Sequence, residues 1–511
     1  MSDNKDALHE LIHALTPMEK WRFKRYAGRY DKGATKKYVK LFDAIAKQSE
    51  YNEEKLIKRF RNEKFINQPA VAKNYLYNII MKSLVEYDEK NVVEIEVNHL
   101  LLSVNKLFEK NLFKQAYKQL HKAQRLIKKH NLPTKSLEAN LKEQNLATYT
   151  LPVHQQAKTF DKLHEKLIEE MSAFQTEREF ILLWRKCMGT NYLYGWPRNN
   201  RELKKYLEIY QHPRLQHEPG GNMSYSRFCY LGIMASYHEL NGDYTKALSV
   251  YKDLLDFMEN KISSKSTTSG QKETHTLNNI NNLFSYLITS LKTEHFFIPD
   301  VQQKWGELEN FSLDKNYSDK IREKAFFYFS MAELERLIVH SNYEEGQSTV
   351  IPIQNVLEDT YSKNTRSPFE YGLLVSLSRF CFYAGMYQQA LYWINKANNH
   401  QAANKVEGNY GWLKILTIII HLELGNDRVI EYSIKSTYRY LAQRKRLFRS
   451  EKIILEFFRN EVPKVYSDKD LNNALQKLYT SLKKIRNDRF EKHILDQFDI
   501  LSWLKNRIKG S

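Results

Sequence analysis

Apolar residues recur along most of the chain at the spacing of an α-helix. Close to the N-terminus, Leu8, Leu11, Ile12 and Leu15 would share one face of a helix with 3.6 residues per turn. Segments that alternate strictly between apolar and polar residues, as half-buried strands do, are scarce. The pattern therefore predicts an all-α protein. In the first 90 residues we expect helices at 4–15, 17–30, 35–48, 53–63 and 69–88.

The starts of these helices carry capping signals. Thr16-Pro17-Met18-Glu19 has the form of a capping box, in which Thr at the N-cap and Glu three residues later satisfy each other's free amides. Proline stands at the first helical position, where no amide donor is needed. Asn52 and Pro69 indicate two further helix starts. We expect a compact N-terminal helical module over residues 1–90.

From about residue 91 the pattern changes to pairs of helices joined by short turns. The segments 110–116, 241–247 and 384–390 each contain a turn-forming residue, an aromatic residue two positions later and an alanine three positions after that. The turn residue takes the left-handed conformation that ends the first helix, and the alanine lets the two helices approach closely. Weaker copies occur at 341–346 and 424–430. We therefore expect internal repeats.

These turn–aromatic–alanine segments resemble the tetratricopeptide repeat family over about 91–440. The stretch 15–24 (LTPMEKWRFK), with Lys73-Asn74-Tyr75-Leu76 further on, is similar to a group of repeat proteins of Bacteroidota bacteria. The resemblance implies a right-handed superhelical solenoid of degenerate helix pairs, with a concave face that binds proteins or peptides and no enzymatic activity. Residues 441–511 would then form basic capping helices. Polar stretches at 211–223 and 262–275 are expected to be loops.

Composition agrees with a helical protein and adds a strong positive charge. Glycine and proline, which turns and sheets consume, number only 17 and 11 in 511 residues. Lysine and arginine exceed the acidic residues by 79 to 60, a net charge of +19. Such a charge attracts nucleic acids, acidic proteins or anionic membranes. Alternatively, it reflects the codon bias of an AT-rich genome, since the excess is spread over several segments.

Cysteine usage and hydropathy predict a cytoplasmic protein without a membrane span. The three cysteines, Cys187, Cys229 and Cys381, lie far apart in apolar helical stretches, which is typical of a reducing compartment. The first residues contain acids and lack the apolar core of a signal peptide. No run approaches 18 consecutive apolar residues.

One motif associated with metal chemistry is present, His9-Glu10-Leu11-Ile12-His13. On a helix, HExxH places two histidines on one face for zinc and a glutamate for an attacking water. Only eight residues precede His9, so no sheet edge comes before it, and Pro17 ends the helix where a third ligand should follow. We find no GxSxG, GxxxxGKS/T or GxGxxG motif. The sequence thus predicts neither an enzyme, a metal site nor a cofactor.

The repeat register predicts which residues of the first helices face the concave groove and contact a protein or peptide partner. These residues are Asn98, Leu101, Asn105, Ser236, Glu239, Arg379 and Phe382. Asparagine suits a peptide backbone because its carboxamide both donates and accepts hydrogen bonds.

Basic surfaces favour an alternative function, a nucleic-acid-associated regulator. A basic patch is predicted at Arg444, Lys445, Arg446 and Arg449. A second row runs along one helix: Lys114, Lys118, Lys122, Arg125 and Lys129. The pair of helices from 53 to 88 could read DNA with Lys73, Asn74, Tyr77 and Asn78. In each case the competing interpretation is an ordinary solvated face. Partner identity and oligomeric state stay open.

Overall fold

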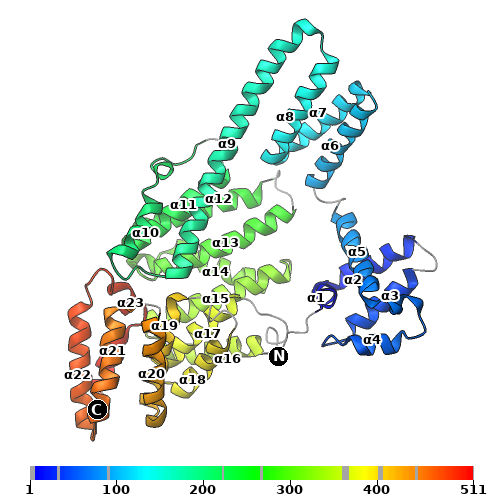
Figure 1. Ribbon diagram of the computed structural model, residues 1–511. Coiled ribbons are helices and arrows are strands. Elements are labelled where there is room, and N and C mark those ends of the chain that lie inside the picture. Colours follow the sequence, from blue (N-terminus) through cyan, green and yellow to red (C-terminus); the bar gives the residue numbers. More distant parts are fainter. Residues whose placement is uncertain are drawn as a thin grey trace. The chain divides into compact units, whose positions relative to one another are not determined.

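The chain is helical throughout the part that the structure describes, and no strand occurs there. The structure is a computed structural model, and it describes residues 6–30, 35–88, 93–220, 224–264, 269–358, 368–400, 407–443 and 447–509. Figure 1 shows helices that follow one another as neighbours along the chain. The fold class predicted from the periodicity is confirmed. Within the described residues, none of the helices combines the length and the apolar character needed to cross a membrane.

Two compact units make up the chain, Met1–Met171 and Ser172–Ser511. The helices that begin in the first unit are α1 Ala7–Ala14, α2 Pro17–Tyr30, α3 Thr35–Ala46, α4 Glu53–Arg59, η1 Lys64–Asn67, α5 Pro69–Asp88, α6 Val93–Glu109, α7 Phe113–His130, α8 Pro133–Thr150 and α9 Val153–Tyr194. The last of these, α9, continues into the second unit.

The N-terminal module of α1 to α5 has its own core, in which Phe23 and Phe42 stack with ring centroids 4.5 Å apart. The predicted capping box is confirmed: the Glu19 amide donates to Thr16 Oγ1 at 3.3 Å, and the Thr16 amide donates to Glu19 Oε2 at 2.7 Å. Asn52 caps α4 by accepting from the Lys55 amide at 2.9 Å. Local signals thus set these helix starts.

Helix α7 packs against both α6 and α8, and these three helices share a second core in the first unit. On α7 the buried face consists of Ala116, Leu120, Ala123 and Ile127. The following helix, α9, is 42 residues long. Pro152 precedes it and Gly195 and Pro197 follow it, while its interior has no proline to interrupt the run.

The second unit continues with α10 Asn200–Tyr210, η2 Pro213–Leu215, α11 Ser224–Leu240, α12 Tyr244–Ser263, α13 Ser269–Ser290, η3 Glu294–Phe297, α14 Pro299–Leu313, α15 Asp319–Val339, α16 Tyr343–Val356, α17 Pro368–Tyr383, α18 Tyr387–Asn399, α19 Glu407–Glu423, α20 Asp427–Gln443, α21 Arg449–Asn460, η5 Val462–Lys464, α22 Asp468–Ile485, α23 Lys492–Gln497 and α24 Ile500–Lys509. Sequential helices pack side by side, and α13, α15 and α17 also contact one another in turn. The expectation of a loop over 262–275 is wrong at residues 262–263, which end α12, and from Ser269 onward, where α13 starts. The threonine hydroxyls of α13 bond back to its own carbonyls.

The five predicted helix pairs share one turn geometry, and the turn from α7 to α8 has it as well, with Asn131 at a φ of 50° and the Leu132 amide bonded to the Ile127 carbonyl. A residue with positive φ ends the first helix in each: Asn111 at 61°, Gly242 at 74°, Ser341 at 53°, Gly385 at 72° and Gly425 at 65°. The amide of the following residue then donates to the carbonyl five residues before it, the bond of a Schellman motif. These are the five turns that the repeat pattern predicted. The helix pairs therefore recur with the same local backbone.

The residue predicted at the contact position of the second helix is buried in all five pairs; it is small in four of them and Ile430 in the fifth, and one case shows why it must be small. Ala116, Ala247 and Ala390 have no exposed surface. At the same position in α16 stands Gly346, where an added Cβ would lie 2.0 Å from the ring of Phe380 on α17. The aromatic ring of one pair thus fills the space that the small residue of the preceding pair leaves.

Candidate interaction surfaces

The end of α17 holds another part of the same chain. This part, the C-terminal segment, comprises Glu491, α23, Phe498, Asp499 and α24. Arg379 is 7% exposed; its guanidinium pairs with Glu335 on α15, Nη1 to Oε2 2.7 Å, and donates to the backbone carbonyl of Gln497. One turn further, the hydroxyl of Tyr383 donates to the carbonyl of Phe498. Two neighbouring carbonyls of the C-terminal segment are therefore bound by side chains of α17.

Aromatic contacts accompany these hydrogen bonds. Phe382 lies 6.1 Å from Trp503 between ring centroids, and Trp412 on α19 stacks on Phe498 at 4.9 Å. The indole nitrogen of Trp503 donates to Glu423 Oε1 at 2.9 Å. The C-terminal segment is thus held by the end of α17 and by two positions of α19, Trp412 near its start and Glu423 at its end.

A histidine fixes the other end of the C-terminal segment. His493 on α23 stacks on Trp196, which precedes α10, with ring centroids 3.8 Å apart and planes 3° from parallel. Its Nδ1 lies 3.0 Å from the hydroxyl of Tyr244, the first residue of α12. Burial, with the nearby cations Lys292 and Lys492, lowers the pKa of His493 to about 4. The imidazole is therefore neutral at pH 7.

The carboxylate of Glu491 caps a helix that begins 42 positions before it. Glu491 is 2% exposed, and its oxygens accept from the amides of Arg449 and Ser450 at 2.7 and 3.0 Å and from the Ser450 hydroxyl at 2.6 Å. A carboxylate at a helix N-terminus satisfies free amides and interacts favourably with the helix dipole. Residues 491–509 are therefore an integral part of the second unit.

Two of the seven predicted partner-binding residues, Arg379 and Phe382, thus contact a chain segment that belongs to the protein itself. Sequence reasoning placed them on a binding face, but it did not identify their occupant. It also missed Tyr383, Glu423 and His493. The available signal was Trp503, a large aromatic residue in an otherwise basic tail.

Ser236 and Glu239, on α11, lie in a polar cluster inside the second unit. Ser236 accepts from Asn191 on α9 at 2.8 Å, and its hydroxyl lies 2.9 Å from that of Tyr210. Glu239 Oε1 accepts from the Thr289 hydroxyl at 2.8 Å, and burial raises the pKa of its carboxyl. These side chains join α9, α10, α11 and α13 to one another.

The three predicted residues on α6 differ in exposure. Leu101 is 1% exposed and belongs to the core of α6 to α8, so it packs inside the molecule. Asn98 is half-buried, and Asn105 is exposed. The Asn105 carboxamide oxygen accepts from the Lys142 ammonium on α8 at 2.6 Å. On α6 the two asparagines remain accessible to a partner.

The predicted basic patch is only partly described. Arg444, Lys445 and Arg446 lie outside the described residues. Arg449 begins α21, and its exposed side chain lies 3.6 Å from Asp488, Nη1 to Oδ2. Its charge is therefore offset by a carboxylate at the surface.

The helix pair α4–α5 has little free charge at the positions expected to contact DNA. The ammonium of Lys73 binds Asp6 and Glu53, each at 2.8 Å, and the Tyr51 hydroxyl at 3.0 Å. These hydrogen bonds raise the pKa of Lys73 despite its partial burial. Asn78 donates to Asn74 on the same helix at 3.3 Å, and Tyr77 is exposed. Lys73 connects three parts of the N-terminal module, so its charge is already paired.

The HExxH motif lies on α1, with the rings of His9 and His13 4.2 Å apart between centroids. His9 Nε2 is 2.9 Å from the backbone carbonyl of Gln48, so this nitrogen joins α1 to the end of α3. Among the described residues, no group of three or more histidine, cysteine or acidic side chains is arranged to bind a metal ion.

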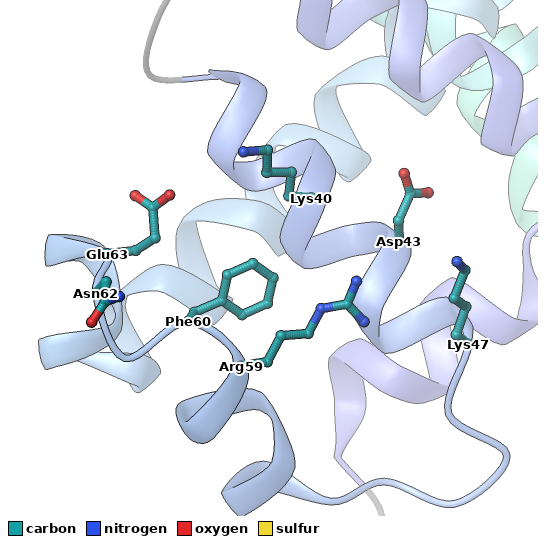
Figure 2. Close-up of a pocket in the computed structure, with 7 residues that line it drawn as sticks. All are labelled: Lys40, Asp43, Lys47, Arg59, Phe60, Asn62 and Glu63. Carbon is teal, nitrogen blue, oxygen red and sulfur yellow. The ribbon is translucent and has the colours of Figure 1, made fainter.

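A hollow of about 470 Å³ lies beside α3 and α4 in the N-terminal module. Figure 2 shows Lys40, Lys47 and Arg59 around it, together with two carboxylates. Asp43 pairs with Lys24 at 2.7 Å, and Glu63 pairs with Lys37 at 3.3 Å, from nitrogen to oxygen. The two lysines that neutralise these acids do not line the hollow, so its net character is cationic.

All three cysteines are free and buried. Burial raises the pKa of the Cys187 thiol, and it raises those of Cys229 and Cys381 to about 12. Thiols of this kind stay protonated at neutral pH and are poor nucleophiles. They act as core side chains.

Comparison with known proteins finds no protein family model, no curated protein and no solved structure that matches this chain.

Proposed function

We propose that the protein is a non-enzymatic scaffold that binds segments of other proteins along the ends of its repeated first helices. The observation that carries the proposal is the way α17 holds residues 497 and 498: Arg379 and Tyr383 donate to two consecutive backbone carbonyls. Binding through the backbone depends little on the sequence of the bound segment. A surface that holds one segment of its own chain in this way has the chemistry to hold a segment of a partner.

The first helix pair offers the same position without a covering segment among the described residues. Asn105 and Arg379 each lie six residues before the positive-φ residue of their turns, Asn111 and Gly385. Asn105 is exposed, whereas Arg379 is buried. Asn98 lies seven residues, or two helical turns, before Asn105 on the same face of α6. Both carboxamides would donate to and accept from the backbone of a partner segment. We place the partner-binding site on α6.

The proposal includes the architecture and the compartment that the sequence suggests. The five equivalent turns support a right-handed superhelical solenoid of tetratricopeptide type. The three free, buried cysteines favour the cytoplasm, where thiols stay reduced.

The test is site-specific photo-crosslinking in cells of the source organism. A photoreactive amino acid at position 105 is expected to crosslink a defined protein partner. The matched control carries the same amino acid at Tyr466, which is 91% exposed and lies between η5 and α22, outside the repeated helix pairs. A partner captured equally from both positions, or a chain that captures none at position 105, would refute the proposed site.

A further inference from the structure

The outer face of α7 carries a row of cations that no described acid neutralises. This row, the α7 stripe, consists of Lys114, Lys118, Lys122, Arg125 and Lys129. All five side chains are exposed, and they lie on the face opposite Ala116, Leu120, Ala123 and Ile127. None of the five forms an ion pair or hydrogen bond with a side chain of a described residue. The α7 sequence FKQAYKQLHKAQRLIKKH contains no acidic residue at all.

On the helices on either side of α7, lysines form ion pairs with acidic residues of the same helix. On α6, Lys106 pairs with Glu109 at 2.9 Å, and on α8, Lys135 pairs with Glu138 at 3.2 Å. In the α7 stripe the neighbours four residues away are cations, and like charges at this spacing destabilise a helix. The surface therefore carries a repulsive row whose charge an external anion would neutralise.

The residue types and the length of the stripe indicate which anion. Lysine is depleted in protein–protein interfaces, whereas lysine and arginine supply many contacts to phosphate oxygens. Four of the five stripe residues are lysines. The stripe covers about 22 Å of helix axis at 1.5 Å per residue, the rise of about six phosphates along one strand of duplex DNA.

We propose that the α7 stripe binds the sugar–phosphate backbone of a nucleic acid without reading its base sequence. This inference goes beyond the scaffold function and does not depend on it, because it uses another helix and another class of partner. Lysine ammonium groups act as point charges, so the contact positions the nucleic acid and leaves the bases unread. The hollow in Figure 2 is a weaker candidate for the same role, since two carboxylates line it.

The experiment measures binding of the purified full chain to a fluorescent 20-base-pair duplex of arbitrary sequence between 50 and 200 mM salt. Five phosphate contacts predict that log K falls with log salt at a slope of about −4 to −5. In the variant K114Q/K118Q/K122Q/K129Q the magnitude of this slope should fall by about 3 to 4. Its affinity for the duplex at 50 mM salt should fall tenfold or more. Because the four side chains are exposed and their mutual repulsion is removed, its melting temperature should equal or slightly exceed that of the parent.

A matched control removes the same formal charge elsewhere. The variant K435Q/K452Q/K464Q/K477Q changes four exposed lysines that each pair with a glutamate. Its slope of log K against log salt should differ from that of the parent by no more than about 1. Equal losses in the two variants, or parent-like binding by the stripe variant, would overturn the proposal.

Two further arms decide the location and the class of ligand. The variant K40Q/K47Q/K55Q/R59Q neutralises the cations of the hollow and of the surface beside it. If this variant loses the salt dependence of duplex binding while the stripe variant keeps it, the nucleic acid binds at the hollow and the proposal fails. If polyglutamate of equal charge binds as tightly as the duplex and depends equally on the stripe, the ligand is an acidic protein and the proposal fails as well. A sequence-independent duplex affinity that only the stripe variant loses is the expected result.

Discussion

The helix pairs α6–α7 and α17–α18 have the same turn but different surroundings. In both, a residue with positive φ ends the first helix and a fully buried alanine follows on the second, Ala116 in one and Ala390 in the other. Six residues before the turn, Asn105 is exposed, whereas Arg379 is 7% exposed and binds a carbonyl of the C-terminal segment. Local sequence sets the turn, and distant sequence sets what the helix end contacts.

The turn and the contacts of the helix end are determined by different parts of the sequence. The turn depends on residues within a few positions of one another, so each pair can form it alone. The occupancy of the helix end depends on residues far along the chain: Glu491 lies 41 positions after Ser450, and Trp503 lies 80 positions after Glu423. The two pairs can therefore be perturbed separately.

The largest expected effect is at the covered helix end. Arg379→Ala leaves the Glu335 carboxylate without its partner and the partly buried Gln497 carbonyl without a donor, so we expect a loss of about 3–5 kcal/mol in the free energy of unfolding. Asn105→Ala, the same position in the first pair, should change it by about 0.5 kcal/mol or less. Urea denaturation of both variants measures the difference. Equal effects at the two positions would contradict the comparison.

The C-terminal segment should also make the second unit sensitive to acid. The folded pKa of His493, about 4, lies below the unfolded value of 6.5, so below pH 6.5 the unfolded chain binds a proton that the folded chain excludes. Stability is then lost as the pH falls from about 6.5 to about 4, by up to about 3 kcal/mol from this group. The His493→Gln variant, neutral throughout, should lose that part of the pH dependence. If parent and variant decline in parallel, the histidine does not carry the effect.

The close contact between neighbouring pairs predicts a reversal of the usual helix propensity. Glycine to alanine inside a helix ordinarily stabilises by about 0.5–1 kcal/mol, and Gly306→Ala on α14, where nothing lies within 4 Å of the new Cβ, should do so. Gly346→Ala should instead destabilise by about 1–3 kcal/mol, because its Cβ would meet the Phe380 ring. Thermal melting of the two variants tests the sign. Stabilisation by both would mean that α16 and α17 do not touch as described.

The smallest expected effect concerns the α7 stripe. Lys118→Gln removes two like-charge contacts four residues apart and should stabilise the protein by about 0.5 kcal/mol at low salt. The effect should vanish at high salt, where exposed charges are screened. Lys106→Gln on α6, which loses an ion pair with Glu109, should have the opposite sign. Melting temperatures at two salt concentrations distinguish these outcomes.

The sequence predicted what its local patterns determine. Helix starts at Pro17 and Pro69 were read correctly from capping and proline signals. Four of the five turns were read from the spacing of a turn residue, an aromatic residue and a small residue, and the turn at Gly425 was read from a weaker copy of this pattern. The loop expected at 262–275 was wrong from Ser269 because a helix tolerates serine and threonine when their hydroxyls bond to its own carbonyls, as that of Thr274 does.

The candidate site was less accessible to such reasoning. Periodicity placed Arg379 and Phe382 on a binding face, but it contains no information on which remote segment covers that face. Ion pairs such as those of Lys73 with Asp6 and Glu53 join residues far apart in sequence, so a lysine that is fully paired looks the same in the sequence as one that is free. The α7 stripe was recognisable because all of its members lie on one helix.

Hydrogen exchange tests the central claim most directly, namely that the end of α17 holds the C-terminal segment. The double variant Arg379→Ala/Tyr383→Phe removes both donors to the carbonyls of Gln497 and Phe498. We expect amides of α23 and α24 to exchange about tenfold faster or more than in the parent, while amides of α6 to α8 keep their rates. Unchanged exchange in α23 and α24 would contradict the account.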